Sequence, residues 1–198
     1  MNENNIKAMI MKKTIILITL CLVALCCPAQ VQHLKFMDIP LNGTITQFQQ
    51  KLTAKGVKYD KAFSAQLPSG ARAFSGDFAG EKADIYIYYD PKSKIVYKAK
   101  AVIDYVTEDI CENKYNEFKA LLSSKYGAFE QSGYDYGHET NTYVIAKENA
   151  SSIDDIIGYI CIYVTEPAIP YPYVRELHFE YVDHHNSLKA DDSKMKDL

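Results

Sequence analysis

Residues 71–103 read ARAFSGDFAGEKADIYIYYDPKSKIVYKAKAVI and contain three runs of strand-forming residues separated by two short turns. The runs cover residues 71–78, 83–90 and 95–103. Their β-branched and aromatic side chains suit a pleated sheet, and residues 79–82 and 91–94 bring the glycine and proline that favour turns. Neighbouring runs joined by such short turns predict an antiparallel meander of three strands.

Two amphipathic helices are predicted, one before and one after this meander. The first begins after Thr44, because Thr44 and Gln47 form a capping-box pattern, and Gly56 fits the left-handed position past its end. The second covers residues 109–126 and ends at Gly127. The apolar residues at helical spacing are Ile45, Phe48 and Leu52 in the first helix, and Cys111, Tyr115, Phe118 and Leu122 with the neighbouring Leu121 in the second. We expect both apolar faces to be buried.

The second helix is followed by a predicted loop over residues 132–141 and by three more strands. These strands cover residues 141–147, 156–165 and 173–183. Helices and strands that come in runs indicate an α+β fold with an antiparallel sheet. The halves, about residues 33–104 and 105–186, each contain a helix followed by strands, so we predict a tandem repeat of two helix-plus-antiparallel-strand units sharing a sheet. The lysine and glycine that end both helices also have a purely electrostatic and steric explanation.

The N-terminal region has the parts of a cleavable export signal over residues 11–29, MKKTIILITLCLVALCCPA. Lys12 and Lys13 precede an apolar run, and small residues precede the expected cut before Gln30. The run is shorter than the roughly 20 apolar residues of a membrane-spanning helix, so we predict cleavage and a mature chain without a transmembrane segment. Residues 1–10 are interpreted as an over-long reading frame in front of this signal.

The mature chain is long enough for one domain, which we predict over residues 30–186. Residues 187–198 are polar and charged, and they are predicted to form a disordered tail. The formal net charge is −3, and it becomes more negative once the lysine-rich signal is removed. A mildly acidic chain without a basic cluster gives no reason to expect a nucleic-acid partner.

Two cysteines, Cys111 and Cys161, remain after removal of the signal. Export to an oxidising compartment permits a disulfide between them. The alternative is a pair of buried thiols that act as small apolar side chains. The sequence leaves both interpretations open, because it does not give the Cα separation on which a disulfide depends.

The best polar constellation for chemistry is Glu176, His178 and Glu180, which share one face of a predicted strand. A histidine between carboxylates could act as a general base or a metal ligand. The alternative is a solvated sheet face opposite an apolar one, which the alternation predicts without any function. Phosphate-loop, metalloprotease and serine-hydrolase motifs are missing from the sequence, so neither a cofactor nor a metal is predicted.

Tyrosine is the strongest compositional signal, with 16 tyrosines and no tryptophan. Exposed tyrosine offers a large contact area at low entropic cost, which is why interfaces favour it. The tyrosines predicted to form a binding surface are Tyr86, Tyr88, Tyr97, Tyr171 and Tyr173. The alternative is that tyrosine fills ordinary strand positions.

Residues 36–43, FMDIPLNG, followed by a helix that ends in Lys55 and Gly56, resemble the start of a group of uncharacterised secreted Bacteroidetes proteins. Those proteins typically begin with phenylalanine and Gly-Ile-Pro, and their second helix ends Lys-Tyr-Gly, as residues 125–127 do here. Asp38 stands where that pattern has glycine. The resemblance implies a cell-envelope location and no known activity, so it assigns no catalytic residues to this chain. The predicted architecture is also similar to that of β-lactamase-inhibitor-like proteins, which implies an aromatic-rich sheet face that holds partners.

These observations together predict an exported protein, located in the periplasm or at the cell surface, that is a non-enzymatic binding or interaction module. The expected partner is an envelope protein or a surface ligand. The alternative prediction is an envelope hydrolase or metal-dependent enzyme that uses the Glu176, His178 and Glu180 face.

Overall fold

The computed structural model describes residues 31–129, 131–135, 138–166 and 175–195, and the following statements refer to these residues. Residues 33–198 form one compact unit of the chain. The predicted signal, residues 11–29, and Tyr171 and Tyr173 lie outside the described residues.

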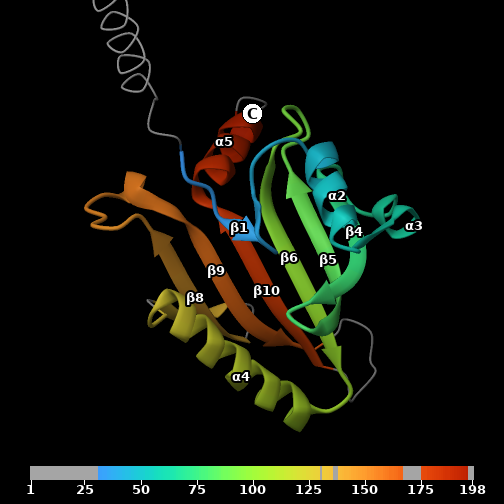
Figure 1. The fold of residues 1–198 in the computed structure, drawn as a ribbon, viewed down its shortest axis with the longest axis vertical. Helices are drawn as coiled ribbons and strands as arrows, with labels where there is room; N and C mark the ends of the chain where they lie inside the picture. The colour runs from blue at the N-terminus through green and yellow to red at the C-terminus, as the bar shows by residue number, and fades with distance from the viewer. Residues whose placement is uncertain (1–30, 130, 136–137, 167–174, 196–198) are drawn as a thin grey trace, which may run out of the picture. The chain divides into compact units, whose positions relative to one another are not determined.

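Eight antiparallel strands form one sheet in the spatial order β3-β4-β5-β6-β10-β9-β8-β7 (Figure 1). The strands are β3 (Lys58–Asp60), β4 (Ala71–Phe78), β5 (Glu81–Tyr89), β6 (Val96–Tyr105), β7 (Gln131–Asp135), β8 (His138–Ala146), β9 (Ile156–Thr165) and β10 (Arg175–Asp183). β4, β5 and β6 pair in sequence order, which confirms the predicted meander. The two groups of four strands meet where β6 pairs with β10. A small separate hairpin is made by β1 (Lys35–Phe36) and β2 (Ile39–Pro40).

Helices α2 (Ile45–Ala54) and α4 (Glu108–Tyr126) lie where the sequence predicts them. In α2 the Thr44 and Gln47 capping box is formed, and Gly56 adopts the expected positive φ of 85°. Ile45, Phe48 and Leu52 are buried, as are Cys111, Phe118 and Leu122 of α4. Leu121, which lies beside this apolar face, is 56% exposed. The shorter helices are α3 (Lys61–Ser64), η1 (Ile153–Asp155) and α5 (His184–Met195).

The hydrophobic core lies between one face of the sheet and helices α2 and α4. Phe118 of α4 packs edge-on against Phe179 of β10, with ring centroids 5.0 Å apart. Phe36, from the N-terminal hairpin, stacks on Phe78 at 5.3 Å and is fully buried. Because side chains alternate along a strand, the strand residues next to each core residue project from the opposite face of the sheet.

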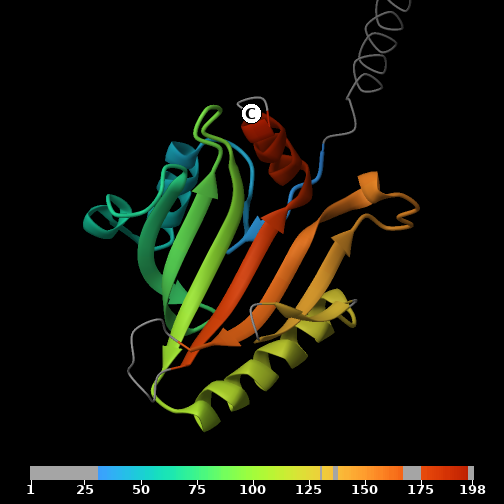
Figure 2. The same cartoon turned by 180° about the vertical axis from the view of Figure 1, so that it is seen from behind.

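We call that opposite side the open face of the sheet. Strand pairing places on it Ser75 and Asp77 of β4, Asp84, Tyr86 and Tyr88 of β5, Lys98, Lys100, Val102 and Asp104 of β6, Glu176, His178 and Glu180 of β10, and Tyr159, Cys161, Tyr163 and Thr165 of β9. Seen from behind, the central strands β5, β6, β10 and β9 run across the view with no described helix in front of their middle parts (Figure 2). The short helix α3 lies beside the open face, where Phe63 contacts the ring of Tyr86.

The prediction of a disordered tail from residue 187 is wrong over the described residues. Residues 184–195 form α5, and Asn186 and Ala190 are buried. The Asn186 side-chain amide donates to the carbonyl oxygens of Leu41 and Val96, at 2.8 and 3.2 Å. These contacts tie α5 to the rest of the unit, so the domain does not end at residue 186. No apolar periodicity predicts α5, because its buried positions are an asparagine and an alanine.

The predicted loop over residues 132–141 is also wrong, because most of this segment belongs to the paired strands β7 and β8. The short edge strand β3 was not predicted either. Both missed strands lie at the two ends of the sheet. A short edge strand buries little, so its residues need not show the apolar alternation by which the central strands were found.

Candidate functional site: the open face of the sheet

Glu180 lies at the centre of a charged group on the open face. Its carboxylate is 2.7 Å from Lys98 Nζ and 3.7 Å from Lys100 Nζ, and it accepts a 2.7 Å hydrogen bond from the Tyr163 hydroxyl. Burial alone would raise the pKa of Glu180, but Lys98, the Tyr163 hydroxyl and Lys100 outweigh it and hold the pKa below its usual value. Burial lowers the pKa of Lys100. One carboxylate therefore pairs with two lysines in a partly buried setting, and the three side chains together keep a net positive charge.

Tyrosine rings surround this charged group. Lys98 Nζ lies 5.1 Å from the ring centroid of Tyr88, and Lys100 Nζ lies 5.6 Å from that of Tyr163. Burial, followed by the Asp84 carboxylate, raises the pKa of Tyr86 to about 12. Tyr86, Tyr88 and Tyr163 are half-buried, so they stay protonated and present both a ring surface and a hydroxyl group.

His178 is 5% exposed, which differs from the solvated face that the alternation predicts. Its ring stacks on Tyr163 with 4.7 Å between centroids and 3° between planes. His178 Nε2 lies 2.6 Å from Thr165 Oγ1 and 3.2 Å from Glu176 Oε2. The stacked tyrosine, a large neighbour on β9, covers the imidazole ring.

The Thr165, His178 and Glu176 group does not have the geometry of a nucleophile, base and orienting acid. In that arrangement the nucleophile contacts one ring nitrogen and the acid contacts the other. Here the threonine hydroxyl and the carboxylate both contact Nε2. Glu180, the third residue of the predicted constellation, is held by Lys98, Lys100 and Tyr163 instead.

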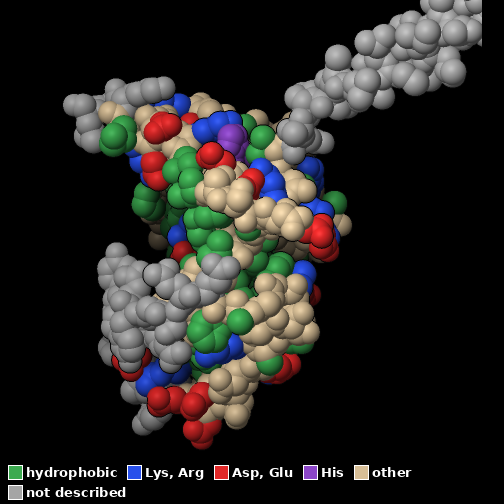
Figure 3. Space-filling view, turned by 90° about the vertical axis from the view of Figure 1, so that its left-hand side faces the viewer, with side chains coloured by type: hydrophobic (Ala, Val, Ile, Leu, Met, Phe, Trp, Pro, Cys, Tyr) green, Lys and Arg blue, Asp and Glu red, His purple; other side chains and the backbone are tan. Residues whose placement is uncertain are grey.

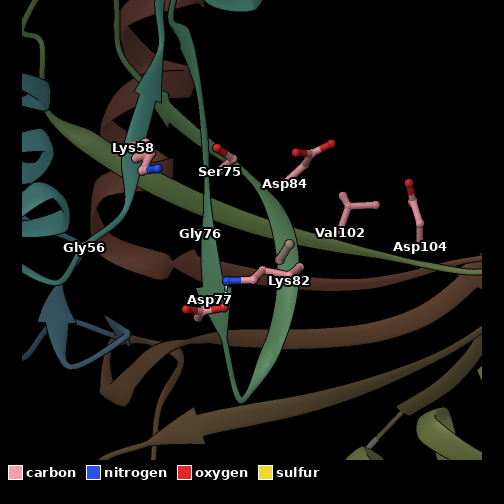
Figure 4. Close-up of a pocket in the computed structure, with 10 residues that line it drawn as sticks. Gly56, Lys58, Ser75, Gly76, Asp77, Lys82, Asp84, Val102 and Asp104 are labelled. Carbon is pink, nitrogen blue, oxygen red and sulfur yellow. Dashed lines mark ion pairs between the residues drawn. The ribbon is translucent and has the colours of Figure 1, made fainter.

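A hollow of about 460 Å³ lies at the β3–β6 end of the open face. Its lining includes Asp84, Val102 and Asp104, whose side chains project in similar directions from β5 and β6 (Figure 4). Burial, followed by Asp104 and Asp60, raises the pKa of Asp84. Lys82, at the rim, turns to Asp77 with 2.6 Å between Nζ and Oδ1 (Figure 4). This end of the face therefore holds carboxylates that repel one another.

Of the five tyrosines predicted to form a surface, Tyr86 and Tyr88 lie together on the open face. Tyr97 lies at the bulge where the β5–β6 register shifts, and its ring is 5.9 Å from Lys194 Nζ of α5. Tyr159 and Tyr163 of β9 also lie on the open face, and neither is among the tyrosines predicted from the sequence. The alternation of isoleucine and tyrosine over residues 156–165 was a signal that could have found them.

Cys111 and Cys161 are not joined by a disulfide. Cys111 lies on the face of α4 that packs on the core, whereas Cys161 projects from the open face between the buried Ile160 and Ile162. The sheet separates the two thiols, so of the two interpretations that the sequence leaves open, the structure shows free thiols. The Cys161 sulfur lies 3.5 Å from Thr142 Oγ1.

We therefore expect both cysteines to be recovered as thiols from protein purified without reductant. Alkylation in denaturant, followed by mass spectrometry of the peptides, should label Cys111 and Cys161 fully. In the folded protein Cys111 should resist alkylation, because it is 1% exposed and burial raises its pKa to about 11. A peptide pair linked through the two sulfurs would contradict this expectation.

A side view that faces the left of Figure 1 shows hydrophobic side chains between charged groups of both signs (Figure 3).

Within the described ranges, no helix has the length and apolar character needed to cross a membrane. The same residues contain no group of three or more side chains placed to hold a metal ion. Compared with protein-family models, curated proteins and solved structures, the chain matches none of them.

Proposed function

We propose that this protein is an exported, non-enzymatic binding module and that it contacts a protein of the cell envelope through the open face of its sheet. The observation that carries the proposal is the set of half-buried tyrosines on that face. Tyr86 and Tyr88 lie on β5 and Tyr163 lies on β9, with β6 and β10 between these two strands. Rigid aromatic rings surrounded by charged groups are typical of contact surfaces between proteins.

The framework of the face also supports binding. Glu180 holds both Lys98 and Lys100, and the stacked pair of His178 and Tyr163 fixes the neighbouring strand. Side chains fixed in this way lose little conformational entropy when a partner arrives. The face is therefore preorganised for contact.

Export rests on residues 11–29, which have the parts of a signal peptide. A periplasmic or cell-surface location, and relationship to the secreted Bacteroidetes proteins, belong to the same proposal. We also infer that the two halves are repeats. Each contains one long helix, α2 or α4, followed by four strands, and the two strand sets run in opposite order through the sheet.

Replacing both Tyr86 and Tyr88 by alanine should abolish capture of the partner while the protein stays folded. The two rings supply contact area on the open face, and their loss should weaken binding at least about tenfold. The measurement is lysine cross-linking in the intact envelope, followed by mass spectrometry of proteins joined at Lys58 or Lys82, which are exposed beside the face.

Tyr59→Ala is the matched control, because Tyr59 packs against Phe74, a core residue on the other side of the sheet. This variant should retain the cross-linked partner. Identical cross-links in wild type and in the Tyr86 and Tyr88 variant, with both proteins folded, would overturn the proposal. Thermal unfolding of each variant shows whether a lost cross-link reflects lost contact or lost structure.

A further inference from the structure

We infer that the partner of the open face is a protein whose contacting loop places an arginine or lysine side chain between Asp84 and Asp104, beside Tyr86. This inference rests on the proposed function and adds the chemistry of the partner. It is carried by charge complementarity at the end of the face that holds the 460 Å³ hollow.

The first step is the balance of charge in this region. Asp84 and Asp104 form no ion pair with a residue in the described part of the chain, whereas the nearby Lys82 is already held by Asp77 at 2.6 Å. Lys58 is the other cation of the lining, and it comes from the short edge strand β3. Elsewhere on the face, Lys98 and Lys100 share the single carboxylate of Glu180, so both lysines already have an acidic partner.

The second step is the repulsion between the carboxylates at this end of the face. Asp104 raises the pKa of both Asp84 and Glu176, after the larger effect of their burial. Asp84 and Glu176 thus lie close enough to Asp104 for its negative charge to disfavour theirs, while Lys100 partly offsets this effect at Glu176. A cationic side chain of a partner would relieve this repulsion between carboxylates. A neutral or anionic side chain would not relieve it.

The third step is the shape of the surroundings. Val102 lies between Asp84 and Asp104 in the lining and is 9% exposed, so the floor there is apolar (Figure 4). Tyr86 follows on the same face of β5, two residues from Asp84. The aliphatic stem of an arginine or lysine suits the valine, and its charged end suits the carboxylates and the tyrosine ring.

The test uses two short blocked peptides as probes, one with two arginines flanking a phenylalanine and one with two glutamates instead. Each is titrated into the isotope-labelled protein and followed by backbone-amide NMR. We expect the arginine peptide to shift the Asp84, Val102 and Asp104 signals in a saturable way that weakens at high salt. The glutamate peptide should leave these signals unchanged.

The double variant Asp84→Asn and Asp104→Asn should bind the arginine peptide about fivefold more weakly, or weaker still. The amides keep the shape of the side chains and remove the repulsion, so this variant should fold. Glu112→Gln combined with Glu148→Gln, two exposed positions outside the open face, makes the same change in net charge and should bind as wild type does.

Equal shifts from both peptides, a preference for the glutamate peptide, no saturable shift, or equal weakening by the two double variants would each overturn the inference. None of these results decides the proposed binding function, which is measured separately by cross-linking of the Tyr86 and Tyr88 variant. A partner lost from that variant, together with a peptide result against the inference, would keep the tyrosine surface and reject the cationic partner.

Discussion

Replacing Asp183 by alanine should lower the free energy of unfolding by about 3 kcal/mol. Asp183 is fully buried, and its Oδ2 accepts a 2.9 Å hydrogen bond from the Leu34 amide and lies 3.0 Å from His33 Nδ1. Its Oδ1 accepts a 2.9 Å bond from the Asn186 amide, in the first turn of α5. One carboxylate thus fixes the N-terminal segment and caps the C-terminal helix.

The expected loss combines a missing helix cap, which costs about 1 kcal/mol, with a buried amide at Leu34 left without its acceptor. Urea unfolding at neutral pH measures it. Asp183→Asn keeps one acceptor oxygen, so its free energy of unfolding should fall less than that of Asp183→Ala. Asp192→Ala, an exposed change in the same helix, should have almost no effect. A loss below about 1 kcal/mol for Asp183→Ala would show that the contacts of Asp183 contribute little.

Replacing Glu180 by alanine should cost about 2 kcal/mol at neutral pH. The change leaves Lys98 and Lys100 as neighbouring cations, with only 25% and 19% of their side chains exposed, and removes the acceptor of the Tyr163 hydroxyl. The stability is lost because the two lysines then repel each other and remain partly buried without the carboxylate that compensates their charge.

The pH dependence distinguishes charge from packing. Because the folded protein lowers the pKa of Glu180 below 4.5, its charge stabilises the fold above that pH, and this contribution is lost as the pH falls through the lowered value. Glu180→Gln, which keeps the size of the side chain, should therefore differ from wild type at neutral pH and approach it in acid. A difference that is constant with pH would assign the effect to packing alone.

The sequence predicted the framework of the protein well because the central elements bury regular apolar faces. The capping box at Thr44, the spacing of Phe118 and Leu122, and the turns between β4, β5 and β6 are local signals, and the structure confirms them. The failures lie where local pattern is weak. Helix α5 is held by a buried asparagine, and strand β3 is only Lys58–Asp60.

The candidate site was predicted in fragments. Periodicity placed Tyr86 beside Tyr88, and Glu176 beside His178, on single strands. It could not place β9 next to β10, and that pairing stacks Tyr163 on His178 and brings its hydroxyl to Glu180. The separation of Cys111 from Cys161 by the sheet likewise depends on contacts distant in the chain.

The sequence by itself determined the α+β class, both long helices and the polar faces of β5 and β10, because these follow from spacings within about twenty residues. The tertiary structure alone decided that β6 pairs with β10, which brings Lys98 and Lys100 to Glu180 and completes the open face. It also decided that Asp183 joins the two ends of the compact unit. Pairing between distant strands depends on how whole surfaces fit together, and no local pattern specifies it.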